Sequence, residues 1–203
     1  MQTPFAFIIS PLEGNRYKNE VEFGDGNKLI VNTDMFNHQF ISREAKVLAT
    51  PSGIDTPIKV GDTVIVHHNI FRRWHDQMGR ERNSSDFISE DKYKCTIDQI
   101  YMYKSDTTWK GLDDFCFVQP VENDEKFIPT KEKRHFGVIV IGNDRLKELG
   151  VEPQDVISFF PNREYEFVVE GKRMYRIRTV DIFAKHEDKE VKVYDPEWTS
   201  YFA

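Results

Sequence analysis

Short apolar runs separated by turn residues are the feature that most restricts what this chain can fold into. The runs are rich in β-branched and aromatic residues, and each has the length of a strand, as Phe5–Ile9 and Val138–Ile141 do. Only 143–149 reads as a helix, with Asn143 as its N-cap and Gly150 after its end. The sequence therefore predicts an all-β protein with few or no helices.

Composition excludes several classes of function. The 16 Phe, 8 Tyr and 3 Trp supply apolar surface for a core, which argues against a disordered chain. No apolar run approaches the roughly 20 residues of a membrane helix, and the N-terminus lacks the pattern of a signal peptide. Two cysteines, Cys95 and Cys116, favour a reducing, cytoplasmic setting. The net charge of −6 argues against nucleic-acid or membrane binding.

Three pairs of segments recur in the same order in the two halves of the chain, which indicates an internal repeat. We therefore expect two β-modules, residues 1–104 and 112–187, joined by the polar stretch around 104–113 and followed by a tail, 188–203. The pairs are Phe5–Ile8 with Phe115–Val118, Val60–Ile65 with Glu152–Ile157, and Tyr93–Tyr101 with Tyr175–Phe183.

The order of short motifs in each half resembles the GroES-like co-chaperonin family. The first half supplies a strand ending in Ser10–Leu12, an aliphatic triplet at Leu29–Val31, a Val-Leu-Ala strand at Ala45–Ala49, and a Val-Gly-Asp-x-Val strand at Lys59–Val64. The second half supplies weaker versions in the same order, ending at Val180–Ala184. The resemblance implies two tandem GroES-like small β-barrels.

Two segments depart from the family pattern. The hairpin that forms the roof in the family is reduced here to Thr50–Pro57, which weakens the expectation of a full dome over a chaperonin cavity. The first module also carries an arginine-rich insertion, 71–85, that the second module lacks. Four arginines around Trp74 could bind phosphate or a nucleobase, but Asp76 and Glu81 favour a solvated loop or an intersubunit contact.

The resemblance places chaperonin binding in the loop 20–41 of the first module. In the family, the triplet that corresponds to Leu29, Ile30 and Val31 docks on the apical domain of the chaperonin, and the loop orders on binding. The other interpretation is that Lys28–Asn32 is one more core strand. In the second module, Phe127 and Ile128 could form a second anchor, although the charged residues around them fit a solvated turn equally well.

No pattern typical of a catalytic or metal site accompanies these motifs. Nucleophile, phosphate-binding and dinucleotide-binding signatures are absent, and we expect no enzyme and no cofactor. His67 and His68 would point to opposite faces of a strand, so we expect no metal site there. Cys95 and Cys116 lie in strand patterns and are expected to be buried rather than nucleophilic.

The sequence thus predicts a cytoplasmic co-chaperonin. Its mobile aliphatic loop would bind the rim of an ATP-loaded, GroEL-like chaperonin ring and help to close the folding chamber. The family forms homo-oligomeric rings through strand edges, and we expect the same here. The alternative is a structural or assembly protein that reuses the barrel without binding a chaperonin.

Overall fold

Strands dominate the protein. The computed structural model describes residues 3–17, 20–23, 27–30, 40–123, 131–187 and 191–194, and of 20–23 and 27–30 it describes the backbone. The only α-helix in these ranges is α1 (Asp144–Glu148), whose N-cap Asn143 accepts the Leu146 amide at 2.8 Å. The predicted all-β class is confirmed. No helix in these ranges is long and apolar enough to cross a membrane.

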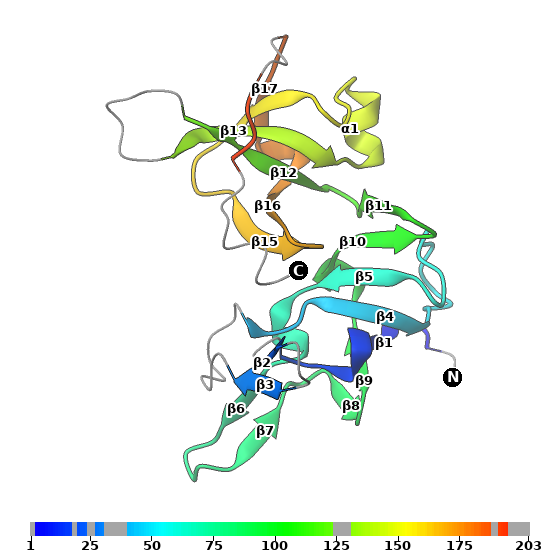
Figure 1. Ribbon diagram of the computed structural model, residues 1–203. Helices are drawn as coiled ribbons and strands as arrows, with labels where there is room; N and C mark the ends of the chain where they lie inside the picture. The colour runs from blue at the N-terminus through cyan, green and yellow to red at the C-terminus, as the bar shows by residue number, and fades with distance from the viewer. Residues whose placement is uncertain are drawn as a thin grey trace. The chain divides into compact units, whose positions relative to one another are not determined.

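The chain divides into two compact units, residues 1–108 and 109–203, and passes from one to the other within strand β11 (Thr108–Gly111). This point lies inside the polar stretch 104–113. A seven-stranded sheet of order β11-β10-β5-β4-β1-β9-β8 has all its strands except β11 inside the first unit (Figure 1). The other strands of this sheet are β1 (Phe7–Pro11), β4 (Glu44–Ala49), β5 (Thr63–Val66), β8 (Phe87–Ser89), β9 (Lys92–Cys95) and β10 (Ile100–Ser105).

Two separate ribbons and short 3-10 helices, among them η1, η3 and η4, make up most of what is described in the rest of the first unit. One ribbon lies in the connection from β1 to β4, and the other lies in the connection from β5 to β8. The ribbons are β2 (Glu20–Phe23) with β3 (Asn27–Ile30), and β6 (Arg73–His75) with β7 (Glu81–Asn83). The 3-10 helices are η1 (Leu12–Gly14), η3 (His68–Ile70) and η4 (Ile97–Gln99).

The second unit holds a six-stranded sheet of order β15-β16-β12-β13-β14-β17 (Figure 1). A 3-10 helix, η5 (Thr179–Asp181), precedes the last strand, as η4 precedes β10 in the first unit. The strands are β12 (Phe115–Glu122), β13 (Glu132–Ile141), β14 (Val156–Phe159), β15 (Tyr165–Val169), β16 (Lys172–Arg178) and β17 (Ile182–His186).

Both sheets have the same antiparallel strand order when β1, β4, β5, β8, β9 and β10 are matched with β12, β13, β14, β15, β16 and β17. The register agrees residue by residue. Ile9 faces Val47 and Tyr93 in the first unit, and Val118 faces Ile139 and Tyr175 in the second. The pairing of β1 with β4 shifts register between Ile8 and Ile9, one residue before the position that Ile9 shares with Val118. The pairing of β12 with β13 shifts at the equivalent point, between Phe117 and Val118.

The turn before β5 repeats before β14 down to its hydrogen bonds. The Asp62 carboxylate accepts the Lys59 amide at 2.9 Å, and the Asp155 carboxylate accepts the Glu152 amide at 2.8 Å. The residue before each aspartate has a positive φ, 95° at Gly61 and 76° at Gln154. Glycine adopts this conformation without strain, whereas glutamine does so at a cost of about 1 kcal/mol.

The observed register corrects the sequence alignment by one residue in two of the three segment pairs. Asp62 matches Asp155, although the sequence comparison placed Asp62 opposite Gln154. Ile8 matches Phe117, although the sequence comparison placed it opposite Val118. The third pair is placed as expected, because Tyr93 and Tyr175 face equivalent residues of β1 and β12.

The predicted closed barrels are not what the structure shows. Each sheet is open, with β11 and β8 as the outer strands of the first and β15 and β17 as those of the second. Closure requires strands long enough to tilt and stagger around an axis. The outer strands contain only three to five residues, and the register shifts at one point in each of the β5–β10 and β14–β17 pairs.

In each unit, apolar side chains on one face of the sheet form a core. In the second unit, fully buried Val118, Ile139, Ile157 and Ile177 pack with Leu146 of α1. In the first unit, Phe7, Ile9, Val47, Val64 and Ile100 are buried at the matching strands. Each unit therefore has its own hydrophobic core, as expected of a compact unit.

Candidate functional site

The predicted binding triplet falls on a ribbon that is separate from the main sheet. Leu29 faces Val21 and Ile30 faces Glu20 across the β2–β3 ladder. In the described part of the chain these two strands pair only with each other, so Lys28–Ile30 is not a strand of the seven-stranded sheet. Val31 lies outside the described residues, and so do Phe127 and Ile128 of the second predicted anchor.

The two chain segments that lead into and out of this ribbon are joined at the base of the loop. Tyr17 and Ile41 form an antiparallel bridge, and the Ser42 amide donates to the Arg16 carbonyl at 2.9 Å. Ile41 and Ser42 are each only 3% exposed. The loop therefore begins and ends at a fixed, buried point of the first unit.

The arginine-rich insertion 71–85 holds this base in place. The Arg16 guanidinium donates to the Phe71 carbonyl at 3.0 and 3.2 Å and to Asn83 Oδ1 at 2.8 Å, and it lies 5.3 Å from the centre of the Tyr93 ring. The Tyr17 hydroxyl accepts the Arg73 amide at 2.8 Å. We call Arg16 and Tyr17 the base clamp. Burial lowers the pKa of Arg16, as expected of a cation that has left water for backbone carbonyls.

The insertion itself is the β6–β7 ribbon, and carboxylates of the same ribbon partly neutralise its arginines. Arg73 pairs with Glu81 at 3.1 Å, and Arg82 pairs with Asp76 at 3.1 Å. The Asp76 carboxylate also accepts the Met78 and Arg80 amides, which fixes the turn and lowers the pKa of Asp76. This charge balance does not favour a phosphate-binding cluster, and the contacts at its base give the insertion a supporting role.

The paired histidines differ from the sequence expectation. The His67 and His68 rings stack with centroids 4.4 Å apart instead of pointing to opposite faces. The reason is that His68 is the first residue of the 3-10 helix η3 and does not lie in a strand. His67 Nδ1 accepts the Asn69 amide at 3.1 Å. Across the residues that the structure describes, no group of three or more metal-binding side chains occurs.

Both cysteine thiols are fully buried. Cys95 faces Phe7 in the first unit, and Cys116 faces Ile177 in the second. Burial raises the pKa of both thiols well above the ordinary value, and nearby Asp86 and Asp114 add to the effect. A thiol that stays protonated in an apolar core is a poor nucleophile.

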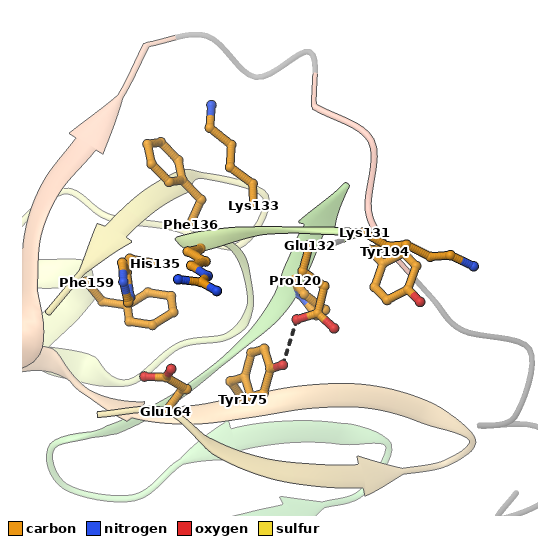
Figure 2. Close-up of a pocket in the computed structure, with 11 residues that line it drawn as sticks. Pro120, Lys131, Glu132, Lys133, His135, Phe136, Phe159, Glu164, Tyr175 and Tyr194 are labelled. Atoms are coloured by element: carbon orange, nitrogen blue, oxygen red, sulfur yellow. Dashed lines mark hydrogen bonds between the residues drawn. The ribbon is translucent and has the colours of Figure 1, made fainter. Parts of the chain in front are cut away.

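A cavity of about 480 Å³ opens on the second unit, and sequence reasoning missed it (Figure 2). Its walls come from the end of β12, the start of β13, the end of β14, the β14–β15 connection at Glu164 and the strand β16, with Tyr194 at one side. Figure 2 shows the Tyr175 hydroxyl bonded to Glu132, with His135 beside Phe159 across the opening. The only signal in the sequence was the match between Tyr93 and Tyr175.

A polar network forms one wall of this cavity. The Arg173 guanidinium pairs with Glu132 and with Glu166, at 2.7 Å to the latter, and donates to the Tyr175 hydroxyl at 2.6 Å. The Tyr175 hydroxyl donates to Glu132 at 2.7 Å. Burial raises the pKa of Tyr175, and its bond to Glu132 raises it further, so the phenol keeps its proton.

No family model matches the chain, and a search of curated proteins returns no match either.

Proposed function

We propose that the protein is a co-chaperonin that binds the rim of an ATP-loaded chaperonin ring through the β2–β3 ribbon. The observation that carries the proposal is the position of Leu29 and Ile30 on a ribbon that stands apart from the main sheet, between β1 and β4. The ordered motifs of both halves of the sequence support it. Nucleotide hydrolysis would belong to the partner.

The base clamp supports a binding role for this segment. When a loop orders on binding, the conformational entropy that it loses lowers the affinity. Joining the loop ends at Tyr17 and Ile41 shortens the segment that must be ordered, which reduces this loss. Each contact would still be weak, and a ring of several copies would restore affinity through effective concentration.

The alternative proposal is an assembly protein that uses the same units without a chaperonin. One observation favours it. The segment Thr50–Pro57, where the family has its roof hairpin, contains no strand and folds back on the N-terminal residues. The Ser52 and Gly53 amides donate to the Thr3 and Pro4 carbonyls at 2.9 and 2.8 Å. The open sheet edges could pair with other chains in either case.

A binding assay separates the two functions. The full chain is mixed with chaperonins, including one from its own host, in the presence of ATP, and complexes are separated by size. We expect co-elution and a change in ATPase rate, both lost in the triple variant Leu29→Ser, Ile30→Ser, Val31→Ser. The matched control replaces exposed apolar residues of the second unit, Val180→Ser and Phe183→Ser, and should retain binding.

Two results would refute the co-chaperonin function. The first is no complex between the unaltered protein and any chaperonin tested. The second is a complex that survives the triple substitution but is lost in the control variant. A self-associated form of the protein without chaperonin binding would favour the assembly function.

A further inference from the structure

The two units differ at one pair of equivalent tyrosines. Tyr93 faces Ile9 of β1, and Tyr175 faces Val118 at the equivalent position of β12. Tyr93 is 1% exposed, whereas Tyr175 is partly exposed to the cavity of the second unit. The same structural position is thus covered in one unit and open in the other.

Inserted residues cover the tyrosine of the first unit. The Phe71 ring meets Tyr93 edge to face with centroids 4.9 Å apart, and Phe71 is 0% exposed. The Arg16 guanidinium lies 5.3 Å from the same ring. Phe71 belongs to the connection between β5 and β8, so a side chain from a long insertion completes this part of the core.

The second unit has no such insertion. The corresponding connection, between β14 and β15, consists of residues 160–164, all of them exposed. Phe159, Tyr175 and Tyr194 line the cavity of about 480 Å³ that results (Figure 2). This volume is within the range of sites that hold small ligands or a few side chains of a peptide.

The cavity offers both an apolar surface and polar partners. The backbone of His135 has a φ of 63°, a conformation that residues other than glycine seldom adopt. Its buried Nδ1 has no hydrogen-bond partner among the described residues. Strain of this kind often marks a binding site. Lys131, Lys133 and Arg134 are exposed at the rim.

The rim attracts negative charge. The two acidic residues that line the cavity are Glu132 and Glu164, and Glu132 shares the Arg173 guanidinium with Glu166. Glu164 is exposed and accepts the Arg163 amide at 2.9 Å. Three exposed cations at the rim therefore outnumber the two carboxylates that line the cavity, so an anionic segment is the favoured occupant.

We propose that this cavity binds an acidic peptide segment of a partner protein through one aromatic side chain. The aromatic ring enters edge-on to Tyr175, as Phe71 does to Tyr93. Acidic residues beside it lie near Lys131, Lys133 and Arg134. The site lies within the second unit and does not depend on chaperonin binding.

Fluorescence anisotropy with a labelled peptide tests the proposal on the full chain. The probe is Gly-Asp-Glu-Phe-Glu-Asp-Gly, and two control peptides replace Phe with Ala or the four acids with Lys. Burying a phenylalanine side chain stabilises by about 1.5–3 kcal/mol, so the Ala peptide should bind about 10- to 100-fold more weakly. The Lys peptide should bind at least about tenfold more weakly at low salt.

Charge reversal at the rim gives the matched protein variants. Lys131→Glu, Lys133→Glu and Arg134→Glu together should weaken probe binding about tenfold, with a smaller effect at high salt. The control reverses the exposed cations Lys110, Lys147 and Lys172, which do not line the cavity, and should bind as the unaltered protein does. Circular dichroism checks that both variants fold.

Three outcomes would overturn the proposal. One is equal binding of the Phe and Ala peptides, and another is equal loss of binding in the rim and control variants. The third is binding that appears only after residues 195–203 are deleted. That result would show that this chain's own segment, which contains Trp198, Tyr201 and Phe202, is the occupant instead of a partner.

Discussion

Asp62 and Asp155 occupy the same turn in the two units, and their replacement by alanine is a matched pair of perturbations. Each carboxylate accepts the amide three residues earlier, at 2.9 Å from Lys59 and 2.8 Å from Glu152. They differ in surroundings. Asp155 is 1% exposed and pairs with Lys185 at 2.6 Å, whereas Asp62 is half-buried and forms no ion pair with a described residue.

These contacts set the expected losses of unfolding free energy. A buried hydrogen bond to a charged acceptor contributes about 1.5–3 kcal/mol, and the Lys185 pair adds at most about 1 kcal/mol because that side chain is 41% exposed. Asp155→Ala should therefore cost the second unit about 3 kcal/mol. The more exposed bond of Asp62 resembles a helix cap, and Asp62→Ala should cost the first unit about 1 kcal/mol.

Hydrogen exchange of core amides as a function of denaturant measures each unit separately. Lys185→Met removes the ion pair with Asp155 and the Lys185 bond to the Gly150 carbonyl but leaves the Glu152 bond intact, so it should cost less than Asp155→Ala does. Losses for Asp155→Ala and Asp62→Ala that agree within about 0.5 kcal/mol would refute the reasoning, since they would show that burial does not set the strength of this bond.

Two further perturbations test the base clamp and the buried thiols. Arg16→Met removes the bonds to Phe71 and Asn83 and should lower the unfolding free energy of the first unit by about 2 kcal/mol. Protease should also cleave the variant faster near the loop base. A loss below about 0.5 kcal/mol, or an equal loss in the control Arg134→Met, would argue against the clamp. Burial raises the pKa of Cys95 and Cys116, so their stabilising effect is complete below the ordinary value of 9.0 and is lost as pH rises above it. Between pH 7 and 10, the unfolding free energy should fall less steeply with pH in the double variant Cys95→Ala, Cys116→Ala than in the unaltered protein. Equal slopes in the two proteins would contradict this cause.

Sequence alone was sufficient for features that depend on local pattern. Alternating and β-branched runs predicted the strands, and Asn143 with Gly150 predicted the helix α1, because each signal lies within a few residues of the structure that it specifies. The match of Tyr93–Cys95 with Tyr175–Ile177 was also readable, since both strands lack a register shift on β1 and β12.

Register, closure and the cavity were decided by tertiary structure. The one-residue errors at Ile8 and Asp62 arose because hydrogen bonds between strands, and not the residues of one strand, fix which positions face each other. The sequence does not show that the sheets stay open, since closure depends on strand length and stagger across a whole sheet. Two equivalent tyrosines differ in exposure because Phe71, which lies 22 residues before Tyr93, covers one, and a five-residue connection leaves Tyr175 open.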